Sequence, residues 1–159
     1  MKKENSVVQK TIVGVILLAF GLILSKESDA QVFHPVKWSY ASKKTGPNEV
    51  VVFLKATIDQ GWHIYSAYQK DGGPVKTSFT FSPAPDFELA GPLSEPKPVT
   101  NYEKVFEMDV SYFENQVIFQ QKVHLKKGQV TVKGSLKFMV CNDRQCLPPE
   151  TVTFSIPVK

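Results

Sequence analysis

Cysteine is scarce in this chain of 159 residues, in which Cys141 and Cys146 are the only two. Two cysteines allow a single intramolecular bond, so a fold held by a network of disulfides is excluded. A structural zinc site needs four ligands, usually in two paired clusters. The three histidines, His34, His63 and His124, lie far apart in the sequence and form no spaced pair. We therefore expect no metal and no small-molecule cofactor.

Strong charge of either sign is also missing. The net charge is +4, and the lysines and arginines are scattered along the chain. Domains that bind nucleic acid usually concentrate basic residues in one patch or stripe. We therefore expect no nucleic-acid partner. The carboxylates are scattered in the same way, and no pair of them stands out for general acid–base catalysis.

No apolar run reaches the eighteen or more residues that a membrane-spanning helix usually needs. The chain starts with MKK, and a shorter uncharged run follows from Thr11 to Ser25. Ser28 and Ala30 then supply the small residues of a signal-peptidase site. This pattern predicts a secretory signal peptide over residues 1–30, cleaved after Ala30, with a retained N-terminal anchor as the less favoured alternative. The protein is expected to be exported to the periplasm, where disulfides form and persist.

A helical repeat is missing after residue 30, and apolar residues recur at every second position instead. Such alternation is typical of half-buried β-strands. It is clearest over 116–125, where Val117, Phe119, Gln121, Val123 and Leu125 share one predicted face. The sequence predicts strands over 36–41, 49–59, 77–81, 87–90, 105–113, 116–125, 130–141 and 151–158.

Seven to nine short strands with turn signals between them predict an all-β protein. We expect an immunoglobulin-like antiparallel β-sandwich that forms one domain over residues 31–159. The proline-rich segment 91–104 is expected to be a long surface loop, and such loops are often functional.

The cysteine pair allows two interpretations. Cys141 ends one predicted strand and Cys146 lies at the entry to the next, so a bond between them is geometrically easy. A closed loop of about six residues adds roughly 2 kcal/mol of stability, much less than a long loop does. The disulfide is therefore either a structural clip or a short-range, accessible pair suited to thiol–disulfide exchange. These local features favour neither interpretation.

Two segments carry a resemblance to a known family. In CNDRQCLPPET (141–151), a cysteine pair is followed by an aliphatic residue, two prolines and Glu-Thr. The second segment is the aromatic QGWHIYSAY (60–68). Together they resemble the N-terminal periplasmic domain of the bacterial disulfide reductase DsbD, and the resemblance extends from about Val36 to Lys159. It implies an immunoglobulin-like fold.

The resemblance also implies roles for individual residues. Cys146 would attack the partner and form a mixed disulfide, and Cys141 would resolve it. The segment 100–109 would supply a cap loop, with Phe106 or Tyr102 as the covering ring. Trp62 and Tyr65 would line the site, although each is equally well explained as an ordinary core or interface aromatic. These four aromatic residues are the predicted cap or partner-binding residues.

The family implies that the domain receives two electrons from a membrane-embedded transporter, often through a thioredoxin-like domain. It would pass them to oxidised exported proteins of the thioredoxin fold, for example in cytochrome c biogenesis. An enzyme of this kind would be a protein-disulfide reductase. The chain departs from the family in having four residues between its cysteines rather than five. It also ends at Lys159, so the electron transporter is expected to act in trans. The alternative is a non-catalytic exported binding module with a structural loop disulfide.

Overall fold

The computed structural model describes residues 33–158, which form strands, turns and connections. The chain divides into two units, Met1–Phe33 and His34–Lys159, and the second contains all of the described strands. The predicted signal peptide, residues 1–30, lies outside the described residues. Within residues 33–158, the chain forms no helix that is long and apolar enough to cross a membrane.

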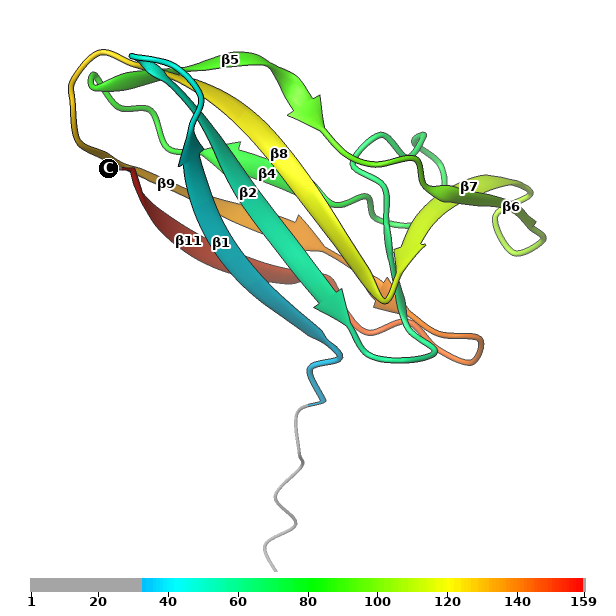
Figure 1. Ribbon diagram of the computed structural model, residues 1–159. Helices are drawn as coiled ribbons and strands as arrows, with labels where there is room; N and C mark the ends of the chain where they lie inside the picture. Colours follow the sequence, from blue (N-terminus) through cyan, green and yellow to red (C-terminus); the bar gives the residue numbers. More distant parts are fainter. Residues whose placement is uncertain (1–32, 159) are drawn as a thin grey trace, which may run out of the picture. The chain divides into compact units, whose positions relative to one another are not determined.

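Eleven strands form three antiparallel sheets in the described part of the chain (Figure 1). Sheet A has the order β1-β2-β8-β5, sheet B has the order β10-β3-β7-β6, and sheet C has the order β11-β9-β4. The strands are β1 (Val36–Lys44), β2 (Glu49–Ile58), β3 (His63–Tyr65), β4 (Ser78–Phe81), β5 (Phe87–Ser94), β6 (Val99–Glu103), β7 (Met108–Glu114), β8 (Gln116–Leu125), β9 (Val130–Phe138), β10 (Val140–Cys141) and β11 (Glu150–Val158). The structure confirms the predicted all-β, immunoglobulin-like antiparallel sandwich.

Sheets A and C pack face to face and enclose the main core. The predicted inward face of β8 is buried throughout, including Gln121, which is 3% exposed. Aromatic rings join the two sheets, since Trp38 on β1 contacts both Phe119 on β8 and Phe138 on β9. Burying one such side chain fully contributes about 1.5–3 kcal/mol to folding. Sheet B packs against this core through part of its side chains.

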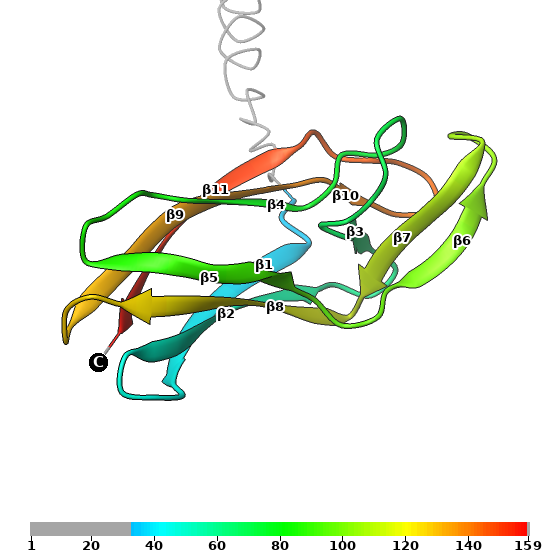
Figure 2. The same cartoon turned by 90° about the horizontal axis from the view of Figure 1, so that it is seen from above.

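Sheet B lies at one end of the sandwich, opposite the connection between β8 and β9 (Figure 2). Each face of this sheet contributes side chains to a different buried cluster, because successive side chains of a strand point to opposite sides. Ile64 and Phe113 on one face join the main core. Tyr65, Val110 and Cys141 on the other face form a second, much smaller buried cluster. Contacts with the main core therefore hold sheet B, including β10 with Cys141, at the end of the sandwich.

The prediction of a long surface loop over 91–104 is wrong. Strand β5 continues to Ser94, and β6 occupies Val99–Glu103. Both are edge strands, where proline is tolerated, and the register of β5 shifts between Ala90 and Ser94. Within this irregular stretch, Gly91 has a φ of 75° and its carbonyl accepts a hydrogen bond from the buried Gln121. Pro92 therefore lies within this irregular stretch and interrupts no regular ladder.

Two of the predicted strands extend by more than one residue beyond the observed ones or contain a break. The strand predicted over 105–113 begins at Met108, because residues 104–107 form a turn that ends at Glu107, with a φ of 52°. The strand predicted over 130–141 breaks at Met139, so that β9 belongs to sheet C and β10 to sheet B. This change of sheet directs Cys141 away from the main core.

Candidate redox site

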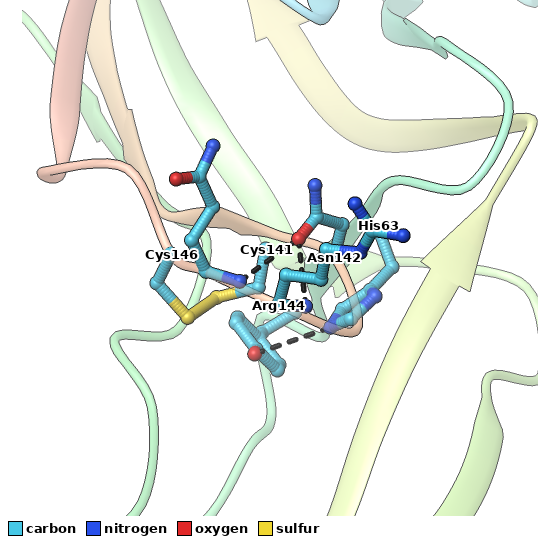
Figure 3. The surroundings of a disulfide bond; sticks show 7 residues. His63, Cys141, Asn142, Arg144 and Cys146 are labelled. Carbon is cyan, nitrogen blue, oxygen red and sulfur yellow. Dashed lines mark hydrogen bonds between the residues drawn. A yellow bond between two sulfur atoms is a disulfide. The ribbon is translucent and has the colours of Figure 1, made fainter.

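Cys141 and Cys146 are joined by a disulfide with a Cα–Cα distance of 4.0 Å (Figure 3). Cys141 lies on β10 and is 2% exposed, whereas Cys146 is exposed at the far end of the loop. The two sulfurs therefore differ in access to a partner. An attacking thiol or disulfide from another protein reaches the Cys146 side of the bond first.

The four residues between the cysteines form a tight, internally bonded loop. The side-chain oxygen of Asn142 accepts hydrogen bonds from the backbone N–H groups of Arg144 and Gln145, each at 2.9 Å. The backbone N–H of Asn142 donates to the carbonyl of Gln145, and that of Leu147 donates to the carbonyl of Val140. Since these bonds do not depend on the disulfide, they favour the same loop conformation when the cysteines are reduced.

Strand β3 forms the wall of the site next to the disulfide. His63 is the register partner of Cys141 in the β10–β3 ladder, so their side chains project from the same face. The His63 Nε2 atom lies 3.2 Å from the Tyr65 hydroxyl. The imidazole also contacts the Tyr112 ring on β7, with 4.9 Å between ring centroids. These contacts fix the ring beside the loop that carries the cysteines (Figure 3).

Burial determines the protonation states of Tyr65 and His63 in this wall. Burial, together with the charge of Glu103, raises the pKa of Tyr65 to about 12. Burial lowers the pKa of His63, although the nearby carboxylates of Glu114, Glu103 and Asp143 act in the opposite direction. Near pH 7 both side chains are therefore uncharged, and the imidazole is able to accept a proton.

A cleft of about 470 Å³ opens over the disulfide. Its lining comes from β3, from the turn between β6 and β7, and from the cysteine loop. The lining residues are His63, Tyr65, Glu103, Val105, Phe106, Cys141, Asn142, Asp143, Arg144, Gln145 and Cys146. The disulfide thus forms part of the lining of a concave surface.

The structure brings some of the predicted site residues together and separates others. Tyr65 and the half-buried Phe106 line the cleft with both cysteines. Tyr102 lies on the edge strand β6, is 62% exposed and does not line the cleft. Trp62 is buried in the main core of the sandwich.

Outside the cysteine loop, three residues that were not predicted individually as site residues also line this cleft: His63, Glu103 and Val105. Glu103 and Val105 belong to the predicted cap segment 100–109. A signal for His63 was present, because it lies two residues before Tyr65 and residues so spaced share a strand face.

Among residues 33–158, no three His, Cys, Asp or Glu side chains are grouped so that they could hold a metal ion.

The model of one protein family, described as "Thiol:disulfide interchange protein DsbD, N-terminal", matches residues 32–157. No curated protein matches the chain in sequence. Among solved structures, the N-terminal periplasmic domain of ScsB from Proteus mirabilis is similar, with a TM-score of 0.56 and 14% identity. The match covers 79% of this chain and 47% of that one, so the chain spans about half the length of the ScsB structure.

A second similar structure is the complex between the DsbD N-terminal and PilB N-terminal domains from Neisseria meningitidis. Its TM-score is 0.51 at 17% identity, and the match covers 79% of this chain and 87% of that one. At such identities the two structures establish the fold alone, and the family assignment comes from the family model. That model covers the sandwich, sheet B and both cysteines of the exchange site. The chain therefore belongs to the family of DsbD N-terminal domains.

Proposed function

We propose that this protein relays electrons in the periplasm by thiol–disulfide exchange through Cys141 and Cys146. The observation that carries the proposal is the unequal exposure of the two cysteines in the lining of an open cleft. A purely structural clip has no need of an accessible sulfur. An exchange pair needs one sulfur within reach of its partner and one protected from it.

In the proposed cycle, the reduced protein donates two electrons to an oxidised partner. The Cys146 thiolate attacks one sulfur of the partner disulfide, a mixed disulfide forms, and the other partner sulfur leaves as a thiolate. Cys141 then attacks the sulfur of Cys146, which closes the internal disulfide and releases the first partner sulfur. Two protons pass from the cysteines to the partner, whose disulfide ends as a dithiol.

The proposed partners are exported proteins with a thioredoxin fold on one side and a membrane electron transporter on the other. The Neisseria domain was solved in a complex with another protein domain, and the ScsB domain is described as periplasmic. Both descriptions fit a cleft that opens to solvent beside an exchange-competent bond. In enzymatic terms, the proposed activity is that of a protein-disulfide reductase.

Phe106 is the proposed covering ring of the site. It is half-buried, lies in the turn between β6 and β7, and lines the cleft together with Cys146. A ring at this position limits access for small oxidants and is displaced when a protein docks, which selects partners by steric exclusion. Tyr102, on the exposed edge strand, is proposed to contact a docked partner rather than cover the bond.

A redox titration with trapping of free thiols tests the proposal directly. A midpoint potential of about −200 mV is expected for an exchange-competent pair. A midpoint well below about −300 mV would assign the disulfide to a structural clip and favour the alternative of a non-catalytic binding module.

A trapping experiment tests the separate roles of the two cysteines. Cys141→Ala should accumulate a mixed disulfide with an oxidised thioredoxin-fold protein, because Cys146 attacks and nothing resolves the product. Cys146→Ala is the matched control and should form little or none. A trap that forms only with Cys146→Ala would reverse the two roles.

A further inference from the structure

In the proposed cycle, no group has yet been assigned to accept the proton that the Cys141 thiol loses. Cys141 is 2% exposed and packs against Tyr65 and Val110, with Met139 at the edge of the same cluster. Apolar surroundings disfavour a thiolate, but only the thiolate is nucleophilic. The resolving attack of Cys141 on Cys146 therefore requires a group that takes up the Cys141 proton.

His63 is placed to be that group. It lies directly across the β10–β3 ladder from Cys141, where facing Cβ atoms are about 4.5–5.5 Å apart. Its side chain lines the same cleft as both cysteines and is partly buried. At such a separation, a ring nitrogen reaches a facing thiol directly or through one water molecule.

We propose that His63 accepts the proton of the Cys141 thiol when Cys141 resolves the mixed disulfide. This inference rests on the proposed exchange function. The imidazole becomes an imidazolium as the Cys141 sulfur bonds to the Cys146 sulfur and the bond from Cys146 to the partner breaks. The partner sulfur leaves as a thiolate and is then protonated, so the two electrons reside on the partner and the imidazolium returns its proton to solvent.

Charged and titratable groups from every neighbouring segment surround His63. They are Tyr65 on its own strand, Tyr112 and Glu114 on β7, Glu103 at the end of β6, and Asp143 and Arg144 in the cysteine loop. Burial lowers the pKa of His63 more than the three carboxylates raise it. The neutral, proton-accepting form is thus the one present near pH 7.

The bond to Tyr65 determines how the imidazole is used. Nε2 and the Tyr65 hydroxyl lie 3.2 Å apart, and the two rings meet edge to face with centroids at 5.3 Å. When Nε2–H donates to the Tyr65 oxygen, Nδ1 has a free lone pair for the Cys141 proton. Tyr65 thereby acts as a positioning residue for the imidazole.

The two steps can be followed separately with an equimolar dithiodipyridine reagent and the reduced full-length protein. The first thiopyridone released reports attack by Cys146, and the second reports resolution by Cys141. For the wild type, we expect the rate of the second phase to rise with pH and to show an inflection below about pH 6.5, where His63 loses its proton. His63→Gln should slow the second phase about tenfold or more and remove the inflection, while the first phase changes less than about twofold.

His124→Gln is the matched control, because His124 lies on β8, outside the cleft, and should leave both phases unchanged. A second phase in His63→Gln with the wild-type rate and pH profile would overturn the inference alone. Equal slowing of both phases would also overturn it, as a structural effect. If His63→Gln does not fold, the wild type decides, and a second phase without an inflection would again overturn the inference. A wild type that releases no thiopyridone at all would instead overturn the proposed function itself.

Discussion

The sandwich of sheets A and C and the redox end, which is sheet B with the cysteine loop 141–146, are built from the same kind of antiparallel strand. They differ in how many side chains they bury. The main cluster draws its buried side chains from both large sheets and includes fully enclosed rings such as Phe119 and Phe138. The cluster behind the disulfide has three buried members, Tyr65, Val110 and Cys141. The main buried core and the disulfide therefore lie in different parts of the described chain, so each can be changed while the other is kept.

The hydrogen bonds differ in the same way. In sheets A and C, ladders of nine residue pairs join β1 to β2 and β9 to β11. In sheet B, β10 contributes two residue pairs and β6 is an exposed edge. Local opening is easiest where buried contacts are few and backbone bonds are exposed. The redox end is thus the part of the domain that can adapt to a docking protein without unfolding the frame.

Phe119→Ala should produce the largest effect and should act on the main core. Phe119 is completely buried and contacts the rings of Trp38, Phe79 and Phe113. Removing such a ring lowers the free energy of unfolding by about 4 kcal/mol. Chemical denaturation measures this loss, and the redox midpoint of the folded protein should not change.

Ile118→Ala is the matched control for that substitution. Ile118 is the neighbouring residue on β8, points to the other face and is 38% exposed. Its truncation should lower the free energy of unfolding by less than about 1 kcal/mol. Equal losses for the two variants would contradict this contrast, because the sandwich would then not be the source of stability.

Reduction of the disulfide should have a smaller effect. The bond closes a short loop that backbone hydrogen bonds and Asn142 already hold together. The loop-entropy relation gives about 2 kcal/mol between the oxidised and reduced proteins, measured by denaturation with and without a reductant. Unfolding of the whole protein on reduction would contradict this, because the disulfide would then be required for the fold.

Phe106→Ala should change access without changing stability. Phe106 is half-buried at the cleft, so removing its ring should expose the disulfide to reagents while the main core stays intact. We expect the oxidised pair to react several times faster with a small thiol reagent, and the midpoint of denaturation to stay within experimental error. Tyr102→Ala serves as the control, because Tyr102 does not line the cleft. An unchanged rate in Phe106→Ala would remove Phe106 from the covering role.

The smallest predicted effect is a pH dependence of stability that comes from His63. Because its pKa is lowered in the folded protein, the unfolded chain binds a proton more readily. The contribution of His63 is complete above the unfolded pKa of about 6.5 and is lost as the pH falls through the folded value. Denaturation curves of wild type and His63→Gln should diverge in this window, with the variant losing less stability on acidification. Parallel curves would contradict the lowered pKa.

How far the sequence predicts the fold is clear from β8 and β5. The alternation in β8 identified every buried position, including Gln121, because burial on one face imposes a period of two. The same rule found only the first half of β5, over 87–90, and missed β6. The side chains of both strands are mostly exposed, and Pro92 within β5 and Pro96 and Pro98 before β6 resemble the prolines of a loop. Edge strands are fixed by pairing with a neighbour, and a local pattern does not reveal that neighbour.

The site divides in the same way. The cysteines lie close in the sequence, so their bond could be expected from their spacing within a hairpin. The resemblance placed Phe106 and Tyr65 near them, and both line the cleft. It also placed Trp62 near the cysteines, but this side chain is in the main core. Whether a strand residue faces the site or the core depends on its register, and one position reverses the answer.

Strand alternation and a short cysteine loop are local properties, so the sandwich and the identity of the disulfide could be read from the chain alone. The burial of Cys141, the exposure of Cys146 and the place of His63 across the ladder from Cys141 emerge only from the folded arrangement. The physical reason is that β-pairing joins segments that are distant in the chain. Their register is selected by the burial of whole strands and not by the residues that perform the chemistry.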